Sequence, residues 1–418
     1  SLDVAAVGRV YLERNPLIMK QLTRLMDFDR EAGLDLVTAL LALHDLGKFS
    51  RPFQAKVPEL WPSALGKFMA LATPRHDTAA WDLWQASEFA RARGAFEANK
   101  SVNSKMRPWL MAVFGHHGVP VLTDPARLAN EVFGKGCFEA AESFVQAVAD
   151  LFLEGPIAAI SARQADRASA SWLVAGVAVL ADWVGSNQTW FPYHAPTLPL
   201  EKYWADIALP RAETAVVIAG VLPARSVSAM PFGMLFEPTY LPSPVQTWAE
   251  TVELPIGPSL IMIEDITGGG KTEAALLLAH RLIADGRASG LFIGLPTMAT
   301  ANAMYERLAD SYVRLFENET ASLVLAHSAA DMNPTFKKSI LQAEIAEARD
   351  PMVGHPADET ATQMCAEWIA DDRRRSFLAD VGVGSVDQAI LGVLPSRHQS
   401  LRLLGLAQKV LILDEIHA

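Results

Sequence analysis

The chain has 418 residues, which is too long for a single compact core, so we expect two or three domains. Hydrophobic residues make up 50% and charged residues 20% of the sequence, a composition typical of globular proteins. The net charge of −11 argues against a protein that coats nucleic acid with its whole surface, although an acidic body can still carry a basic groove.

The cysteines and the apolar stretches of the sequence indicate the cellular compartment in which the protein resides. The two cysteines, Cys137 and Cys365, lie far apart in no metal-binding spacing, so we expect no disulfide framework and a reducing cytoplasm. The N-terminus lacks the pattern of a secretory signal, and the longest apolar stretches, such as Leu173–Leu180, are too short to span a bilayer. These features predict a soluble, cytoplasmic protein with no membrane partner.

The first 205 residues have the pattern of a helical domain. Apolar residues recur at three- and four-residue spacing in Leu17–Met26 and Leu36–Leu43, and Ile157–Val184 is Ala-rich and periodic. We therefore expect an all-α domain over residues 1–205. A linker helix and an irregular, proline-rich linker are expected over residues 206–240.

From residue 241 to residue 418, strand-like and helix-like runs alternate. Four runs have the apolar character of buried strands, namely Ser259–Glu264, Ser289–Leu295, Ala321–Leu325 and Lys409–Asp414. Two helical patterns, Glu273–Asp285 and Ala299–Leu315, lie among them. Such alternation predicts a parallel sheet buried on both faces. The fold class is therefore multidomain, with an all-α domain followed by an α/β domain.

A glycine-rich turn follows the first of these runs. Its three glycines let backbone amides approach phosphates, Lys271 reaches the β- and γ-phosphate oxygens, and Thr272 binds Mg²⁺. Asp265 stands where the strict phosphate-loop pattern has a glycine, so the match is not complete. An ordinary glycine-rich loop is the alternative interpretation. The predicted nucleotide-binding residues are Gln246, Thr267, Gly268, Gly269, Gly270, Lys271, Thr272, Asp414 and Glu415.

Paired acids end the last strand-like run. In the order Asp414, Glu415, Ile416, His417, the first acid is suited to hold Mg²⁺ and Glu415 to act catalytically by orienting the attacking water. This D-E-x-H box and the glycine-rich loop resemble those of superfamily 2 helicases, whose motor domain is RecA-like. The segment ending at Gln246 resembles the adenine-reading motif of these motors, with a plain turn as the alternative.

Two further segments resemble the DNA-contacting segments of such helicases. One contains Pro296, Thr297 and Thr300 and follows a strand, and the other contains Gly384 and Ser385. Hydroxyl and amide contacts of this kind position a nucleic-acid backbone without reading its sequence. Three arginines at residues 373–375 either add positive charge nearby or form a solvated helix face.

Histidines and acids in the first half form a candidate metal site. His44 and Asp45 end an apolar helix, and Lys48 lies on the same side of the turn, where a cation can stabilise the charge of a transferring phosphate. A mixed His/Asp set suits Mn, Fe, Ni or Co, and two such divalent ions fit phosphodiester hydrolysis. Capped helices, core histidines and salt bridges are the alternatives. The predicted ligands are His44, Asp45, His76, His116, His117 and Asp182, and the predicted catalytic residues are Asp45, Lys48 and Glu415.

The order of these ligands resembles the HD phosphohydrolase superfamily. Together with the Gly-His-His-Gly and Ala-Asp-Trp-x-Gly-Ser-Asn segments and the helicase core, the chain resembles the signature helicase-nuclease of type I CRISPR systems. The resemblance implies a metal-dependent nuclease with Asp45 bridging two ions, and an ATP- and Mg-dependent 3′–5′ translocase. It also implies single-stranded DNA as substrate and an RNA-guided surveillance complex as partner. We expect a monomer.

The sequence departs from that family pattern at both ends. Family members usually carry one more metal-ligating histidine just before a segment like Leu2–Val7, and here the chain begins at Ser1. They also carry a second motor domain after the acid box, where this chain stops at Ala418. Relative to the pattern the chain is expected to be truncated, and a truncated motor is not expected to translocate.

Two other functions stay open. One is an HD nucleotide phosphohydrolase, acting on dNTPs or cyclic nucleotides, with an attached ATPase. The helicase-like segments oppose it, because a nucleotidase needs no DNA-contacting segments. The other is a docking module that binds a surveillance complex without cutting.

Overall fold

The computed structural model describes residues 1–65, 67–68, 75–118, 121, 129–193, 198–236, 241–309, 312–316, 321–326, 377–394 and 399–415. Their contacts define two compact units, the first made largely of residues 1–222 and the second largely of residues from 223 on. The predicted arginine run at 373–375, Cys365, and His417 of the acid box lie outside the described residues.

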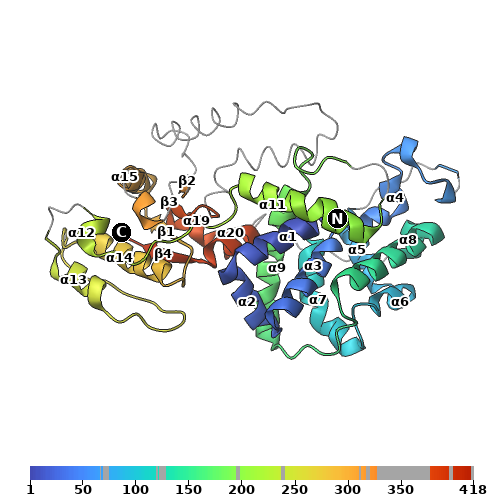
Figure 1. The fold of residues 1–418 in the computed structure, drawn as a ribbon, viewed down its shortest axis with the longest axis horizontal. Helices are drawn as coiled ribbons and strands as arrows, with labels where there is room; N and C mark the ends of the chain where they lie inside the picture. Colours follow the sequence, from blue (N-terminus) through green and yellow to red (C-terminus); the bar gives the residue numbers. More distant parts are fainter. Residues whose placement is uncertain are drawn as a thin grey trace. The chain divides into compact units, whose positions relative to one another are not determined.

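The first unit is built from helices, as predicted. Its main helices are α1 (Leu2–Arg14), α2 (Pro16–Met26), α3 (Arg30–Ala42), α5 (His76–Gln85), α7 (Lys100–Phe114), α8 (Ala129–Phe152), α9 (Gln164–Gly185) and α11 (Leu209–Ile218). Short helices are α4 (Arg51–Gln54), α6 (Ala90–Arg93) and α10 (Leu200–Tyr203). Helix α1 packs against both α3 and α9, and α7 packs along α9 (Figure 1).

Local sequence signals fix the starts of several of these helices. The side chain of Asn15 accepts a hydrogen bond from Ile18 N, with Pro16 at the first helical position of α2. Asp29 caps α3 by accepting from Ala32 N, and Asn99 caps α7 in the same way. These caps set where α3 and α7 begin, and hence where the residues after their C-terminal ends lie.

Helix α9 corrects two predictions. The periodic stretch predicted as Ile157–Val184 becomes helical only at Gln164. With 22 residues and a mean hydropathy of 1.4 over its most apolar 18-residue window, α9 is the one helix among the described residues that is long and apolar enough to cross a membrane. The expectation that every apolar stretch is too short was therefore wrong. In this structure 67% of its most apolar window is buried inside the protein. The apolar residues of α9 therefore pack in the core of the first unit, as in the core helix of a globular protein.

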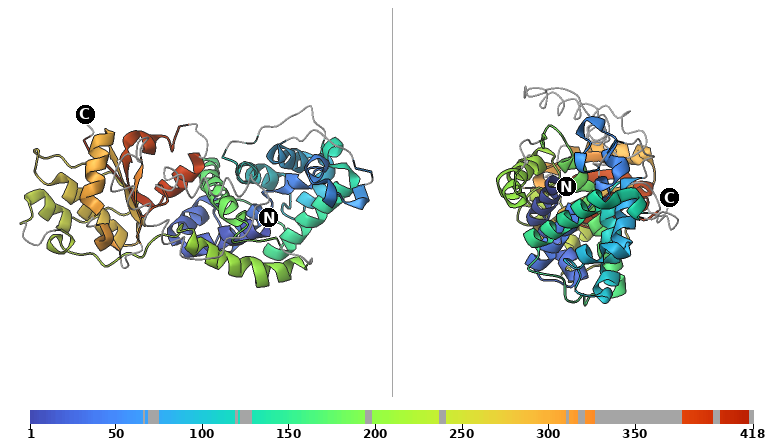
Figure 2. Two further views of the ribbon diagram at one scale, coloured as in Figure 1. Left: turned by 90° about the horizontal axis from the view of Figure 1, so that it is seen from above. Right: turned by 90° about the vertical axis from the view of Figure 1, so that its right-hand side faces the viewer.

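The second unit is a parallel sheet with helices packed against it, again as predicted. The strands β1 (Gly290–Leu295), β2 (Leu323–Ala326), β3 (Val381–Ser385) and β4 (Lys409–Leu413) are arranged in the order β2-β3-β1-β4. The helices are α12 (Phe232–Leu235), α13 (Pro244–Thr251), α14 (Lys271–Ala284), α15 (Met298–Ala309), α19 (Val386–Ile390) and α20 (Gln399–Leu406). Figure 2 shows the strands gathered in the orange-to-red part of the chain.

One predicted strand is absent from this sheet. Residues Ser259–Glu264 alternate as a strand would, because Ile261 and Ile263 pack against the core while Leu260 and Met262 are exposed. They form no ladder with β4 or with any other described strand. The prediction of a strand here was wrong, since alternation alone does not supply backbone pairing.

The two ends of the segment predicted as a linker, residues 206–240, pack in different units. Helix α11 packs against α1 in the first unit. Phe232 and Leu235 of α12 are buried in the core of the second unit.

Candidate metal centre and nucleotide-binding loop

The six predicted metal ligands come together in the first unit. His44 and Asp45 follow α3, His76 begins α5, His116 and His117 follow α7, and Asp182 lies in the last turn of α9. Two groups could each hold an ion, with ligand atoms within 4.8 Å of one another. The groups are His76, His116, His117 and His44, His116, Asp182. His116 belongs to both.

Asp45 lies between the two groups. Its Oδ2 is 3.0 Å from His44 Nε2, whereas its Oδ1 is 3.5 Å from His76 Nε2 and 3.9 Å from His116 Nε2. One oxygen therefore faces the group of His44, and the other faces the group of His76. With ions bound in both groups, this placement would allow the carboxylate to contact each of them.

A close backbone approach brings the turn of Asp45 to the helix of His76. A Cβ atom on Gly47 would lie 1.8 Å from the carbonyl oxygen of His76 and 2.8 Å from Ala80 N. Only glycine fits this contact without moving the backbone. Gly47 therefore allows Asp45 and His76 to share a site.

Hydrogen bonds to the backbone orient two of the histidines. His44 Nδ1 lies 2.8 Å from Leu41 O, and His116 Nδ1 lies 3.2 Å from Val113 O. When each Nδ1 donates its proton to the carbonyl, the Nε2 lone pair is left to bind a metal ion, an arrangement common in metal sites.

Several polar atoms of the site fit a bound ion. Asp45 Oδ1 is buried and makes no hydrogen bond among the described residues, which is costly without a partner, and His44 Nε2 faces the carboxylate oxygens of Asp45 and Asp182 at 3.0 Å and 3.5 Å. His76 Nε2 and His117 Nε2 lie 2.9 Å apart. Two nitrogens bound to one ion at about 2.1 Å and at right angles would be about 3 Å apart. The residues present therefore fit divalent metal ions.

The electrostatics agree with that donor set. Burial lowers the pKa of His116 to about 3 and the pKa of His76 to about 4, which keeps both rings neutral. Burial also disfavours protonation of His44, but the negative charges of Asp45 and Asp182 outweigh burial and raise its pKa. The field that attracts a proton to His44 attracts a metal cation equally.

Two further side chains support the carboxylates. Lys48 Nζ lies 2.7 Å from Asp45 Oδ2, the side of the turn that the sequence predicted. Ser186 Oγ donates a hydrogen bond of 2.9 Å to Asp182 Oδ1. Sequence reasoning assigned Ser186 no role, although it lies four residues after Asp182, one helical turn away, and that spacing was available.

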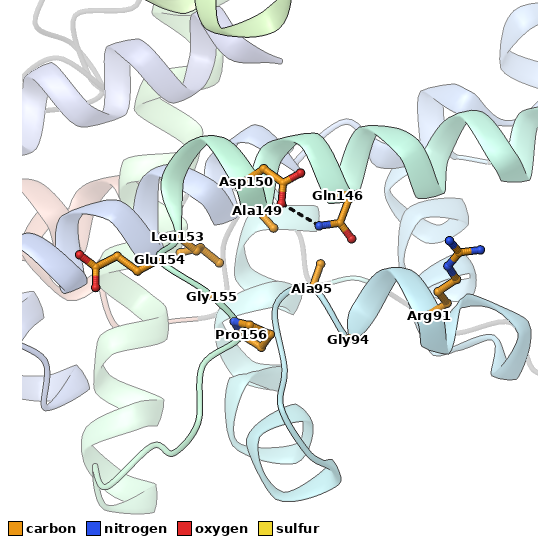
Figure 3. Close-up of a pocket in the computed structure, with 10 residues that line it drawn as sticks. All are labelled: Arg91, Gly94, Ala95, Gln146, Ala149, Asp150, Leu153, Glu154, Gly155 and Pro156. Carbon is orange, nitrogen blue, oxygen red and sulfur yellow. Dashed lines mark hydrogen bonds between the residues drawn. The ribbon is translucent and has the colours of Figure 1, made fainter.

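The cavity drawn in Figure 3 is a different place. It has a volume of about 540 Å³ and is lined by α6, the end of α8 and the following loop, including Arg91, Gln146 and Asp150. None of the six metal-ligand candidates lines it.

In the second unit the glycine-rich loop leads into α14. Gly270 has φ +90°, a left-handed conformation that favours glycine, and it is the residue before the helix. Lys271 Nζ donates hydrogen bonds of 2.9 Å to the carbonyl oxygens of Asp265 and Ile266. The ammonium is thus held by its own loop.

The acid box lies against this loop. Thr272 Oγ1 donates a hydrogen bond of 3.0 Å to Asp414 Oδ2. Asp414 Oδ1 accepts from Glu415 N, and Glu415 has φ +57°, a rare conformation outside glycine. The hydroxyl and the carboxylate are the oxygen ligands that Mg²⁺ prefers.

Gln246 lies against the loop with both amide atoms engaged. Its Oε1 accepts from Ser243 N, and its Nε2 donates to Gly270 O over 3.3 Å. Ser243 Oγ donates to Gly269 O over 2.8 Å. Sequence reasoning missed Ser243, which a capping-box pattern would have shown.

The predicted DNA-contacting residues lie at one edge of the sheet. Thr297 and Thr300 cap α15, with their hydroxyl oxygens 2.9 Å apart, and both are exposed. Gly384 and Ser385 end β3 next to the end of β1, and Ser385 is 8% exposed. Pro296 is half-buried directly after β1.

Comparisons with known proteins agree with this arrangement. Residues 1–191 match the family model described as Cas3, HD domain. The chain is 31% identical over 445 residues to the CRISPR-associated endonuclease/helicase Cas3 of Escherichia coli (strain K12) and 31% identical over 425 residues to that of Thermus thermophilus. The alignments cover 100% of this chain, which spans just under half (48% and 44%) of those relatives.

Solved structures extend the similarity to both units. The crystal structure of T. fusca Cas3-AMPPNP matches 100% of this chain and 44% of its own chain, with a TM-score of 0.77 and 27% identity. A crystal structure of a CRISPR-associated protein matches 100% of this chain and 46% of its own, with a TM-score of 0.78 and 28% identity. The first unit therefore matches the HD domain of Cas3, and the whole chain is similar to just under half of the CRISPR-associated Cas3 relatives.

Proposed function

We propose that the first unit is a metal-dependent nuclease that cuts single-stranded DNA, and that the second unit belongs to an ATP-driven 3′–5′ translocase, both acting in CRISPR interference. One observation supports the nuclease above all. Two groups of ligands share His116, with the two oxygens of Asp45 facing one group each. Two adjacent ions suit the displacement of one oxygen by another at a phosphodiester.

The proposed centre holds two ions of the Mn, Fe, Ni or Co type, since imidazole and carboxylate ligands together favour these metals. Bound there, they supply Lewis-acid polarisation of the scissile phosphate. The protein contributes six ligands that fix their positions. Lys48, 2.7 Å from Asp45, neutralises part of the charge that develops on the phosphate.

The second unit is proposed to bind ATP with Mg²⁺. Lys271 leaves the carbonyls of its own loop for the phosphates, and Thr272 and Asp414 hold the Mg²⁺. Glu415 orients the attacking water. The segments after β1 and β3 hold the DNA backbone through hydroxyl and amide groups.

The proposed partner is an RNA-guided surveillance complex, and the proposed compartment is the cytoplasm, with the chain monomeric. Similarity to CRISPR-associated Cas3 proteins over the whole chain supports the partner. Gel-shift assays on target DNA already opened by a type I surveillance complex test it, and light scattering tests the monomer. A shift on free duplex alone, without the complex, would contradict the partner.

The nuclease is tested by incubating the protein with circular single-stranded DNA and Mn²⁺, Co²⁺ or Ni²⁺, without ATP. We expect cutting that depends on the metal and is absent in the Asp45→Ala variant. A variant of the cavity in Figure 3, Gln146→Ala, serves as a control that should cut like the unsubstituted protein.

Other outcomes favour the alternatives. Release of phosphate from dNTPs with no cutting of DNA would indicate a nucleotide phosphohydrolase. Metal binding without hydrolysis of either substrate would indicate a docking module.

A further inference from the structure

An aromatic ring flanked by two lysines lies beside the metal centre. Phe53, in the short helix α4, has its ring centroid 5.7 Å from that of His76, with an interplanar angle of 70°. The Nζ atoms of Lys56 and Lys48 lie over the Phe53 ring, 4.8 Å and 5.6 Å from its centroid. A cation, a ring and a second cation thus adjoin one metal-ligand candidate.

The exposure of this group distinguishes it from core packing. Phe53 is half-buried and Lys56 is exposed. Lys48 is tied to Asp45, whereas the Lys56 ammonium forms no ion pair within the part of the chain that the structure describes. The half-buried ring therefore adjoins an exposed cation that is available to an anion.

Single-stranded DNA offers both groups that this arrangement recognises. Bases stack on aromatic side chains, and lysines neutralise phosphates. A base inside a duplex is already stacked on both faces and paired, so it does not reach such a ring without leaving the helix.

We propose that Phe53 and Lys56 form a nucleotide-binding subsite for the residue next to the scissile phosphate. This inference rests on the proposed nuclease and deepens it. The base stacks on Phe53 in the place that the Lys56 ammonium occupies, and the ammonium moves to the phosphate of the same nucleotide. The subsite favours single strands, because only an unpaired base fills it.

A purely structural role for Phe53 is the competing account. Its ring packs edge-to-face on His76, so removing it would displace a metal ligand and slow every substrate equally. The two roles differ in their dependence on the base. A small dialkyl phosphodiester, which carries neither a base nor any other aromatic ring, distinguishes them.

The experiment compares kcat/KM for single-stranded DNA with kcat/KM for that small diester, in Mn²⁺, for the Phe53→Ala and Lys56→Ala variants. We expect the ratio to fall by about tenfold in each, the size of effect that one stacked base gives. Phe53→Trp should keep the ratio of the unsubstituted protein. On DNA with abasic sites, Phe53→Ala should cost far less than on intact DNA.

Lys100→Ala is the matched control for lost charge. Lys100 is exposed and begins α7, a 15-residue helix whose far end, about 20 Å away, leads into His116. In Lys100→Ala, the ratio of kcat/KM for single-stranded DNA to kcat/KM for the small diester should equal that of the unsubstituted protein.

Three outcomes would overturn the proposal. An unchanged ratio in Phe53→Ala, in an active protein, would remove the subsite and leave the nuclease. Equal slowing of DNA and diester would assign Phe53 to positioning His76 only. Failure of the unsubstituted protein on both substrates would overturn the nuclease, and the subsite with it.

Discussion

Single atoms decide what the metal centre can hold. His116 and His44 each turn Nδ1 toward a backbone carbonyl, so their Nε2 atoms face the carboxylates of Asp45 and Asp182. A histidine elsewhere on an apolar face lacks that arrangement. The orientation of the rings, more than the residue type, suits them to bind a metal ion.

The shared position of His116 gives a prediction on stoichiometry. His116 belongs to both ligand groups and His117 to one. We expect His116→Ala to lose both proposed ions and His117→Ala to retain one, measured as bound Mn²⁺ per chain after dialysis. Circular dichroism checks that both variants keep their helices. Equal stoichiometry in the two variants would refute the shared ligand.

Glu97 gives a prediction on pH. It is 8% exposed, and burial raises its pKa to about 7, although Asn103 and Arg93 act in the opposite direction. The folded state holds the proton on Glu97 more tightly than the unfolded state does. The resulting contribution to the free energy of unfolding is complete below pH 4.5, the ordinary pKa of a glutamate, and is lost as the pH rises through 7. Glu97→Gln should remove the loss, which amounts to at most about 3 kcal/mol.

Urea unfolding at pH 5 and pH 8 measures the effect of Glu97. The free energy of unfolding of Glu97→Gln, relative to the unsubstituted protein, should be higher at pH 8 than at pH 5. A difference that does not change with pH would show that Glu97 is charged in the folded state at both values.

At the scale of elements, the sequence predicted helices better than strands. The 3.6-residue period is local, so the helices around the metal centre and α14 were found. Ser259–Glu264 was not a strand, because a strand also needs a partner edge, which is non-local. The predicted helix Ala299–Leu315 ends at Ala309, before a 3-10 turn at Tyr312–Leu315.

The six ligand candidates were predicted from residue types and local motifs, and the structure brings them together. What supports them was not predicted. Ser186 holds Asp182 through a hydroxyl, and Gly47 permits a backbone contact with His76. Both depend on where two elements meet, and a single sequence carries no direct record of that meeting.

Gly47→Ala tests the contact between two of these elements. Its Cβ would overlap the carbonyl of His76, so the 3-10 turn Leu46–Phe49 and α5 must separate. We expect metal affinity to fall by about tenfold or more, as for lost outer-shell support, measured by calorimetric titration with Mn²⁺. The control is Gly233→Ala, where a Cβ meets open space. Equal affinity in both variants would contradict the role of Gly47.

At the scale of the whole molecule, the two candidate sites lie in different units and share no residue. Lys271→Ala should therefore weaken ATP binding by about 10- to 150-fold, the effect of losing a charged hydrogen bond, and should leave metal-dependent cutting of single-stranded DNA intact. Nucleotide binding followed by fluorescence and cutting of circular DNA without ATP measure the two. Loss of cutting in this variant would show that the units depend on each other.

The strand order of the sheet has a consequence for how force could pass through the second unit. Asp414 follows β4, the exposed threonines follow β1, and Ser385 ends β3, with β1 between the other two. Neighbouring strands lie about 5 Å apart. An ion pair between Glu273 of α14 and Arg307 of α15 joins the helices that follow the two proposed ligand-binding loops. If the proposed ATP and DNA sites are correct, a shift at the nucleotide needs to cross only one strand's width to reach the threonines after β1, so the sheet would couple the two sites directly.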